Sequence, residues 1–370
     1  MTAPFTLSDS IDSQITPSLE SFGSVVPEKI ALTGASKTLM GLLIQKITEW
    51  PNVKEIHVFD LRPPKVPSSK IVFHRTDLLK DGADRAMSQL LQKNEIKHFI
   101  HGALYSGPSR KAFYQKEVET IGTFHVLNAI AEAQVTQFLV LSDTFVYGAA
   151  ESNPNFLTEK SPLRASSRSP FFRGRLDVEK QVSEFMKYYP TINTSVLRFS
   201  PTLGPNSTQV RAHYFLMGAI PKIVGYDPLL QFIHEMDATR AITKALISQA
   251  RGVFNIVGAG VLPLTTAIHM SGKLAVPVPS PLCYGVFKSA FALQLWDFAS
   301  DWIPFFKYIC VADGSKAKKE MDFEAKFSSR QALRAFLDSY ALKQSGFVYP
   351  SVAFGEDVVM IKDQKFERIY

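Results

Sequence analysis

Short apolar runs alternate with longer amphipathic stretches from residue 29 onward, and this alternation limits the folds open to the chain. The runs have the length of buried strands, and the stretches between them carry apolar residues at helical spacing. Strands that alternate with helices predict βαβ units and a parallel sheet. The runs occupy residues 29–33, 55–60, 71–73, 97–101, 137–142, 194–199 and 252–257. The predicted fold class is therefore α/β, a doubly wound parallel sheet.

The alternation loosens after Pro201, where Pro, Phe and basic residues become more frequent. This change predicts a smaller C-terminal lobe. The start of the chain is rich in Ser, Thr, Pro and acidic residues and lacks the charged and apolar regions of a signal peptide. The predicted division is a disordered leader at 1–27, a first domain of alternating strands and helices at 28–200, the smaller lobe at 201–345 with 252–258 returning to the first domain, and a tail at 346–370.

Charge and cysteine content exclude some classes of function. The net charge is +7, but no block of five or six basic residues occurs, so we expect no nucleic-acid partner. Diffuse positive charge equally suits an acidic small molecule or an anionic surface. The two cysteines, Cys283 and Cys310, cannot form a disulfide framework or a zinc site. We therefore expect no metal and a reducing, cytoplasmic location.

A glycine turn follows the first apolar run, in the segment IALTGASKTLMG that ends at Gly41. Dinucleotide sites need glycines here for a tight turn, for backbone approach to the pyrophosphate and for close packing of helix on strand. Gly34 supplies the turn, whereas Lys37 and Met40 occupy positions where glycines are usual and Gly41 comes one residue late. Taken alone, this degraded motif fits any turn from strand to helix.

Later strand ends favour a dinucleotide. The second run ends in Asp60, 26 residues after Gly34, where a carboxylate would accept both ribose hydroxyls. Small residues end the fourth run and leave room for a cofactor. Together these features predict a Rossmann-type dinucleotide-binding domain. The predicted cofactor-binding residues are Gly34, Ser36, Lys37, Thr38, Leu39, Asp60, Arg62, Asp77, Leu78, Gly102 and Ala103.

Eight segments carry a resemblance to a known family. In chain order they are TGASKTLMG, HVFDLRPP, RTDLL, HFIHGA, IGTFHVLNAI, FLVLSDTFVYG, VLRFSPTLGP and QFIHEMDATRAI. The chain resembles the extended short-chain dehydrogenases/reductases, and within them the UDP-glucose 4-epimerase-like NAD-dependent epimerase/dehydratases, from about residue 29 to 336. The resemblance implies a Rossmann sheet, a small substrate lobe, NAD or NADP, and a homodimer formed through two long helices, here about 110–133 and 176–188.

The choice between NAD and NADP depends on three side chains. Asp60 would repel the 2′-phosphate of NADP, whereas Lys37 and Arg62 would attract it. A carboxylate at the ribose usually decides, so the predicted cofactor is NAD, with NADP as the alternative.

The residues that match the family's catalytic positions are replaced. The resemblance implies a Ser or Thr, a Tyr that exchanges a proton, a Lys beside it and an Asn behind them, in a run of the form Ser-Pro-Tyr-Gly-x-Ser-Lys. Here Phe171 stands in the place of the Tyr and Arg175 in that of the Lys. Glu119 occupies the Asn position, and Asp143, with Thr144 beside it, that of the Ser or Thr.

These replacements leave two functions open. In one, the chain is an NAD-dependent enzyme in which Asp143 or Glu119 acts as the base and Thr144 donates a hydrogen bond. In the other, it is a catalytically silent scaffold or redox-sensing regulator that binds the dinucleotide. Tyr147, in the VYG segment, is expected to be a packed structural aromatic residue.

The substrate side also departs from the family. Leu230 stands where nucleotide-sugar enzymes carry an Arg that holds the diphosphate, and Pro201 where an Asn often contacts the substrate. The ligand is therefore a small molecule of unknown identity, either sugar-nucleotide-like or apolar. Asp237 is expected to cap a helix at 238–245.

An aromatic segment at residues 284–310 has two interpretations. The favoured one is a helix that covers the smaller lobe. The other is an apolar tunnel or a contact with a membrane surface, because Phe287, Phe291, Leu295 and Phe298 recur at helical spacing. Charged residues and Pro304 interrupt the segment, so it is not expected to span a membrane.

Overall fold

The computed structural model describes residues 26–105, 111–166, 169–207, 210–295 and 299–344. The predicted tail, most of the predicted leader, Arg168 and Phe298 lie outside these residues.

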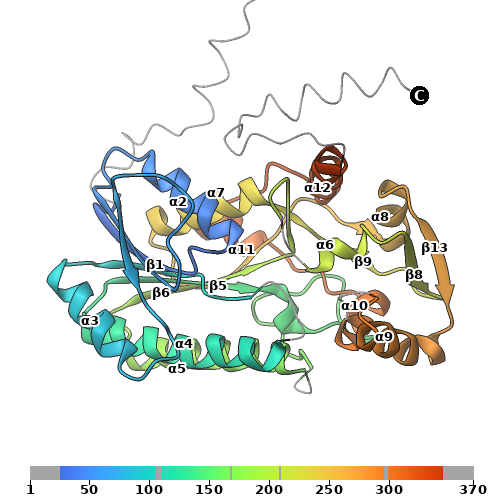
Figure 1. Cartoon of the computed structure of the whole chain (residues 1–370), viewed down its shortest axis with the longest axis horizontal. Helices are drawn as coiled ribbons and strands as arrows, with labels where there is room; N and C mark the ends of the chain where they lie inside the picture. Colours follow the sequence, from blue (N-terminus) through green and yellow to red (C-terminus); the bar gives the residue numbers. More distant parts are fainter. Residues whose placement is uncertain (1–25, 106–110, 167–168, 208–209, 296–298, 345–370) are drawn as a thin grey trace, which may run out of the picture.

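One seven-stranded sheet organises the larger part of the molecule (Figure 1). Its strands follow the spatial order β11-β6-β5-β4-β1-β2-β3, and every neighbouring pair is parallel. The order reverses between β1 and β4, the crevice where doubly wound sheets bind their ligands. The strands are β1 (Lys29–Thr33), β2 (Glu55–Asp60), β3 (Ile71–Arg75), β4 (His98–His101), β5 (Gln137–Asp143), β6 (Asn193–Phe199) and β11 (Gly252–Ile256).

Helices cover both faces of this sheet, as Figure 1 shows. One face carries α2 (Thr38–Thr48), α7 (Glu235–Ser248) and α11 (Ser315–Met321). The other carries α3 (Ala83–Lys93), α4 (Ala112–Glu132) and α5 (Pro170–Tyr188). The predicted α/β, doubly wound Rossmann-type fold is confirmed.

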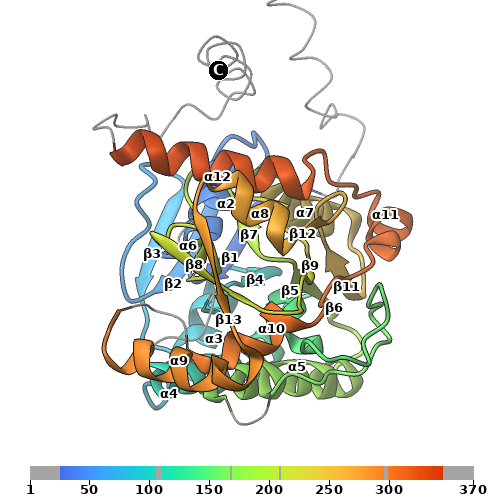
Figure 2. The same ribbon diagram turned by 90° about the vertical axis from the view of Figure 1, so that its right-hand side faces the viewer.

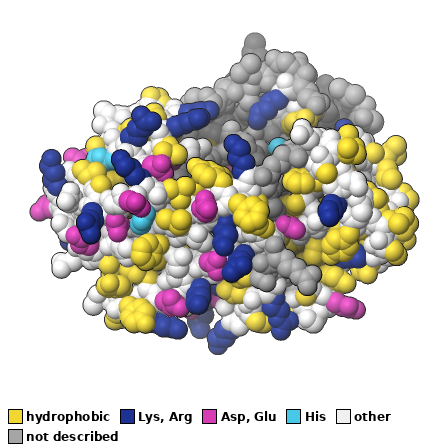
Figure 3. Space-filling view, turned by 60° about the horizontal axis from the view of Figure 1, so that its bottom comes forward, with side chains coloured by type: hydrophobic (Ala, Val, Ile, Leu, Met, Phe, Trp, Pro, Cys, Tyr) yellow, Lys and Arg dark blue, Asp and Glu magenta, His cyan; other side chains and the backbone are white. Residues whose placement is uncertain are grey.

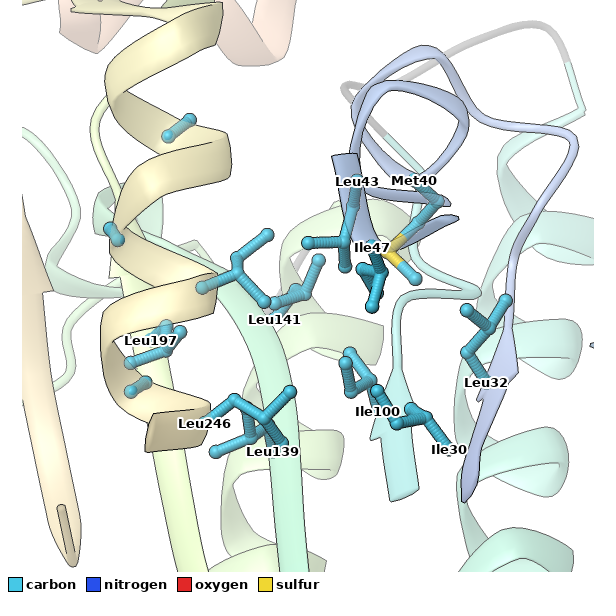
Figure 4. Close-up of a cluster of buried hydrophobic side chains, with 14 of the residues drawn as sticks. Ile30, Leu32, Met40, Leu43, Ile47, Ile100, Leu139, Leu141, Leu197 and Leu246 are labelled. Atoms are coloured by element: carbon cyan, nitrogen blue, oxygen red, sulfur yellow. The ribbon is translucent and has the colours of Figure 1, made fainter. Parts of the chain in front are cut away.

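The core between α2, α7 and the sheet shows why the strands are apolar on both faces. Ile30, Ile100 and Leu139 point from neighbouring strands toward α2 and α7, and Ile47 and Leu246 meet them from the helices (Figure 4). All five are fully or almost fully buried. Burying such a side chain contributes roughly 1.5–3 kcal/mol, so this layer fixes α2 and α7 against the sheet.

The smaller lobe lies at one end of the sheet and has a separate aromatic core (Figure 2). It contains two parallel strands, β8 (Ala219–Ile223) and β13 (Leu274–Val278), which pair only with each other in the described chain. Its remaining elements are α6 (Val210–Tyr214), α8 (Leu264–Met270), α9 (Cys283–Ala292), α10 (Ile303–Lys307) and α12 (Ser329–Gln344), three short 3-10 turns, η2 (Thr144–Tyr147), η3 (Ser280–Leu282) and η4 (Ser300–Trp302), and the two-residue strands β7 (Thr202–Leu203), β9 (Leu229–Leu230), β10 (Ile233–His234) and β12 (Leu262–Pro263).

Two expectations about this lobe have different outcomes. The aromatic segment does form helices that cover the lobe, with Phe287 and Trp302 buried in its core. The expected capping role of Asp237 is wrong, because α7 begins at Glu235 and the side chain of His234 accepts the hydrogen bond from the backbone N–H of Met236. Asp237 lies inside the first turn, where it accepts a hydrogen bond from the backbone N–H of Phe327 and pairs with Arg240.

Within the described chain, no helix combines the length and the apolar character needed to cross a bilayer.

Candidate functional site

Gly34 forms the turn between β1 and α2, and no other residue fits its position without strain. Its φ is +79°, in the left-handed region that glycine adopts freely. A Cβ at this position would lie 2.3 Å from the carbonyl oxygen of Gly102, at the end of β4. The backbone N–H of Lys37 closes the turn on the carbonyl oxygen of Gly34, at 2.9 Å. The turn therefore brings the N-terminus of α2 against the end of β4.

Met40 replaces the glycine that usually lets the first helix pack closely on the sheet, and Gly102 compensates for it. A Cβ at Gly102 would lie 2.5 Å from the sulfur of Met40, so the missing side chain on β4 makes room for the extra one on α2. Gly41 does not serve this purpose, because a Cβ there would meet nothing within 4 Å.

An outer pocket lies beyond the ends of β1, β2 and β4. Asp60 stands at its edge, where one carboxylate oxygen accepts the backbone N–H of Ser36 at 3.1 Å and the other that of Leu61 at 2.7 Å. The carboxylate is thus held against the Gly34 turn. The lining residues are Gly34, Ser36, Lys37, Phe59, Asp60, Leu61, Thr76, Asp77, Leu78, Leu79, Ala103, Tyr105, Tyr114 and Val118.

An inner pocket lies between the N-terminus of α2 and the ends of β5 and β6. Its walls are mostly apolar, but the carboxyl groups of Asp143 and Glu235 also belong to them. The lining residues are Lys37, Thr38, Leu39, Met40, Gly102, Leu104, Tyr105, Leu141, Ser142, Asp143, Phe145, Arg175, Phe199, Ser200, Pro201, Thr202, Ser207 and Glu235.

Lys37 and Tyr105 line both pockets and therefore mark the passage between them. The Lys37 ammonium lies 3.7 Å from the centre of the Tyr105 ring, a cation–π contact. Burial lowers the pKa of Lys37, and the charges of Glu119 and Asp60 oppose that shift. The cation at the N-terminus of α2 adds to the positive end of the helix dipole, an arrangement that favours a bound anion.

Phe171 and Arg175, at the family's Tyr and Lys positions, lie on α5 in different environments. Phe171 is buried in the aromatic core, in edge contact with Phe172, and is not part of the inner pocket's lining. Arg175 is 2% exposed, and its guanidinium donates hydrogen bonds to the carbonyl oxygen of Tyr105 at 2.5 Å and to Glu119 at 3.1 Å. It also forms an ion pair with Asp143, whose carboxylate lies 3.1 Å from Nε. The positions that exchange protons in the family therefore hold an aromatic core residue and an ion-paired cation.

Glu119 completes this cluster from α4. One of its oxygens accepts the backbone N–H of Tyr105 at 2.7 Å as well as the guanidinium of Arg175. The other is buried and has no hydrogen-bond partner among the described residues. Burial raises the pKa of Glu119 to about 7, although Arg175 acts in the opposite direction. Burial also raises the pKa of Asp143. Its side chain is nevertheless 17% exposed.

Tyr147 belongs to a second buried network below the pocket. Its hydroxyl donates to Asn255 at 2.7 Å and accepts from Arg198 at 2.9 Å. Arg198 in turn forms a bidentate pair with Glu179. Every group here is bonded inside the protein, so Tyr147 is a structural residue, as predicted.

The structure brings most of the predicted cofactor-binding residues together around the two pockets. Arg62 is exposed and belongs to the lining of neither pocket in the described chain. Of the predicted catalytic residues, Asp143 and Arg175 line the inner pocket, whereas Glu119 and Phe171 lie behind it and Thr144 is buried in η2.

Several residues of the pocket linings were not predicted from the sequence, among them Tyr105, Glu235 and Phe145. Tyr105 follows β4 by four residues, a position at a strand end that could have been noticed. Glu235 lies in the QFIHEMDATRAI segment, two residues before Asp237, and lines the inner pocket. Phe145 carried no signal, because its position in the pocket depends on how η2 packs against Trp302 and Phe305.

Comparisons with known proteins agree with this geometry. The chain is 26% identical to the uncharacterized protein Rv0501 of Mycobacterium tuberculosis, over 83% of this chain and 82% of that protein. Its fold matches DesIV, the dTDP-glucose 4,6-dehydratase of Streptomyces venezuelae, with a TM-score of 0.68, 17% identity and coverage of 86% of this chain and 98% of that one. The UDP-glucose 4-epimerase of Thermotoga maritima matches with a TM-score of 0.63, 16% identity and coverage of 85% and 99%. At these identities the two structures establish the fold.

The family assignment comes from the sequence model of the NAD dependent epimerase/dehydratase family, which matches residues 32–257, more than half of the chain. The predicted resemblance to this family is confirmed. NAD, the predicted cofactor, is the cofactor of this family. The chain belongs to the NAD dependent epimerase/dehydratase family.

Proposed function

We propose that this protein binds NAD across the two pockets and does not carry out the tyrosine-dependent proton transfer of its family. It acts as a dinucleotide-binding scaffold or redox-sensing regulator. One observation carries this proposal: Arg175, at the Lys position, is ion-paired with Glu119 and Asp143, while Phe171, at the Tyr position, is packed in the core.

The residues present fit NAD. The turn at Gly34 leaves space that a Cβ would fill, and Asp60 is positioned for the hydroxyls of the adenine ribose. Lys37 and the N-terminus of α2 would face the pyrophosphate. The inner pocket would take the nicotinamide, which in a bound cofactor accepts or donates a hydride. Asp60 favours NAD over NADP, because it would repel a 2′-phosphate.

The acid/base arrangement favours binding over catalysis. A positioned acid or base contributes roughly 10²–10⁴ in rate, and phenylalanine has no proton to exchange. A guanidinium has only N–H donors and no acceptor, so Arg175 cannot take the place of a base. Its two carboxylate partners are held by the ion pairs they form.

Calorimetric titration of the purified protein with NAD, NADH, NADP and NADPH tests the proposal, together with analysis of any nucleotide retained through purification. We expect NAD or NADH to bind, and we expect no hydride transfer to the nicotinamide with UDP-glucose or dTDP-glucose. Failure of all four nucleotides to bind would contradict the proposal. Hydride transfer by the wild-type protein with either sugar nucleotide would also contradict it.

Asp60→Asn is expected to weaken NAD binding by about tenfold or more. Hydrogen bonds to a charged group contribute roughly 1.5–3 kcal/mol, or about 10- to 100-fold in affinity. The preference for NAD over NADP should shrink at the same time, because the repelling charge is gone. Titration calorimetry measures both effects. Arg62→Gln is the matched control and should change neither, since Arg62 lies outside both pockets; equal losses in the two variants would contradict the assignment of Asp60.

Asp143 supports a second candidate function, an oxidoreductase or epimerase with a non-standard base. It lines the inner pocket, keeps 17% of its side-chain exposure and has a pKa raised by burial. In this alternative its substrate is sugar-nucleotide-like or apolar. Leu230, at the position of the arginine that holds the diphosphate in nucleotide-sugar enzymes, is buried in the core of the smaller lobe. This position therefore offers no charged group to a diphosphate. Turnover that is lost in Asp143→Asn while NAD still binds would support this function.

Glu235→Gln is expected to make stability less dependent on pH. Burial raises the pKa of Glu235 to about 7 from an ordinary 4.5, so the folded protein holds this proton more tightly than the unfolded chain does. The stabilisation from this bound proton is complete below the pKa that Glu235 has in the unfolded chain. It is lost as the pH rises through the pKa that Glu235 has in the folded protein. Between about pH 5 and pH 8 the loss should be on the order of 2 kcal/mol.

Urea unfolding at these two pH values measures the difference between wild type and Glu235→Gln. Glutamine imitates the protonated carboxyl group, so its hydrogen bonds with Asn206 need not be lost. Glu119, with a pKa also raised to about 7, leaves a residual dependence in the variant. Identical pH profiles for the two proteins would contradict the burial argument for Glu235.

We also propose that the protein is a homodimer, formed through α4 and α5, in the cytoplasm. Large apolar side chains remain exposed on these helices, among them Phe113, Ile121, Phe124 and Tyr188. Such side chains on two adjacent long helices suit a self-complementary interface. A monomeric mass in solution scattering would contradict the dimer.

A further inference from the structure

Exposed apolar side chains gather at the outer end of the smaller lobe, far from the seven-stranded sheet. In Figure 2, β13 and α9 both face the viewer at this end, and Figure 3 shows hydrophobic side chains gathered at the same end of the molecule. Leu274, Leu293 and Leu295 are 78%, 69% and 75% exposed. We name this surface the distal patch; its members are Leu274, Val276, Leu282, Tyr284, Val286, Leu293 and Leu295.

Packing of the lobe does not explain these side chains. The inner face of α9 buries Cys283, Phe287 and Ala290 in the core of the lobe. A surface helix normally presents polar residues on its opposite face. Here Lys288 and Ser289 lie on that face, but Tyr284 and Val286 on its two flanks are exposed as well. Strand β13 also exposes apolar side chains, because every position before Val278 is exposed.

The charged side chains within the segment that carries the distal patch have one sign, and the next acidic residues in the chain are Asp297 and Asp301. No acidic residue occurs from Lys273 to Leu295, and Lys273 and Lys288 are both exposed. On neighbouring β8, Lys222 lies 3.8 Å from Asp227, so this carboxylate is already paired. The patch therefore combines apolar side chains with ammonium groups and has no carboxylate of its own.

This combination disfavours a second copy of the chain as the occupant. A symmetric dimer would bring the patch against itself, so Lys273 and Lys288 of each copy would face a segment that contains no acidic residue. An anionic lipid surface satisfies both features, because its acyl boundary takes apolar side chains and its headgroups attract lysine.

We propose that the distal patch docks the protein on an anionic lipid surface. Leu274, Leu293 and Leu295 enter the boundary between headgroups and acyl chains, while Lys273 and Lys288 contact the headgroups. The attachment is peripheral and reversible. It does not depend on the proposed NAD binding, since the two pockets lie at the ends of the seven-stranded sheet.

Flotation of the full-length protein with vesicles tests the proposal. The probe is a vesicle of phosphatidylglycerol and phosphatidylcholine in equal amounts, with pure phosphatidylcholine vesicles as the comparison. We expect binding to the mixed vesicles at low salt, and about tenfold less to phosphatidylcholine alone or at high salt. The double variant Leu293→Ser/Leu295→Ser should lower binding to the mixed vesicles by about tenfold or more.

Matched controls separate the patch from the rest of the surface. Lys288→Glu should weaken binding several-fold, whereas Lys180→Glu, at an exposed lysine of α5, should not. Phe156→Ser removes an exposed apolar side chain elsewhere and should leave binding unchanged. Circular dichroism verifies that each variant is folded.

Three outcomes would overturn the proposal. The first is no binding to the mixed vesicles at low salt. The second is equal binding by wild type and Leu293→Ser/Leu295→Ser. The third is a molecular mass in solution that falls only in the patch variants, which would show that a second copy covers the surface instead.

Discussion

Arg175→Met is expected to lower the free energy of unfolding by about 3–5 kcal/mol, the range found when one partner of a buried ion pair is removed. Arg175 is the cation that Glu119 and Asp143 share, and all three lie close to the inner pocket. Without it, Glu119 would keep a buried carboxyl group, one oxygen of which already has no partner in the part of the chain that the structure describes. The carbonyl oxygen of Tyr105 would lose its donor as well.

Chemical denaturation of wild type and variant at neutral pH measures the effect. The matched control is Arg173→Met, at an exposed arginine on the same helix, which should change stability by less than about 0.5 kcal/mol. Adding Glu119→Gln to Arg175→Met should recover part of the loss, because the uncompensated carboxyl group is then removed. A loss of less than about 1 kcal/mol in Arg175→Met would contradict the role of the arginine as the countercharge of the cluster.

Gly34→Ala is expected to destabilise the protein by about 3 kcal/mol or more and to abolish NAD binding. A residue other than glycine in the left-handed region costs roughly 1–3 kcal/mol. The added methyl group would also lie 2.3 Å from the carbonyl oxygen of Gly102, and neither backbone segment can move without shifting β1 or β4. The displaced turn would no longer hold Ser36 against Asp60.

Gly41→Ala is the control for this variant. Gly41 lies inside α2, and a Cβ there would meet nothing within 4 Å. Alanine at an interior helix position is favoured over glycine by roughly 0.5–1 kcal/mol, so this change should stabilise the protein and leave NAD binding intact. Thermal unfolding and titration calorimetry measure both variants. Equal behaviour of the two would contradict the assignment of Gly34 as the turn glycine.

Local patterns were sufficient to predict the fold and the outer pocket. Apolar runs separated by helical periodicity require buried strands between covering helices, and the carboxyl ends of parallel strands share one edge of the sheet. Gly34, Asp60, Asp77 and Ala103 were therefore predicted near one another from their positions after strands alone, and they line one pocket.

Contacts between distant segments decided the rest. The sequence showed that Met40 replaces a glycine, but not that Gly102, 62 residues later, removes the resulting clash. It showed Arg175, Glu119 and Asp143 as separate substitutions, but not that α4, α5 and β5 join them in one buried ion cluster. The helix cap was assigned to Asp237 rather than His234, because a cap depends on where the chain leaves β10.

The sequence by itself thus determined the order and kind of the elements, since hydrophobic periodicity along the chain specifies which face of each element must be buried. The tertiary structure alone decided which replaced residues became partners. Charge pairing and steric fit depend on separations of a few ångströms between segments that are far apart in the chain, and periodicity carries no information about them.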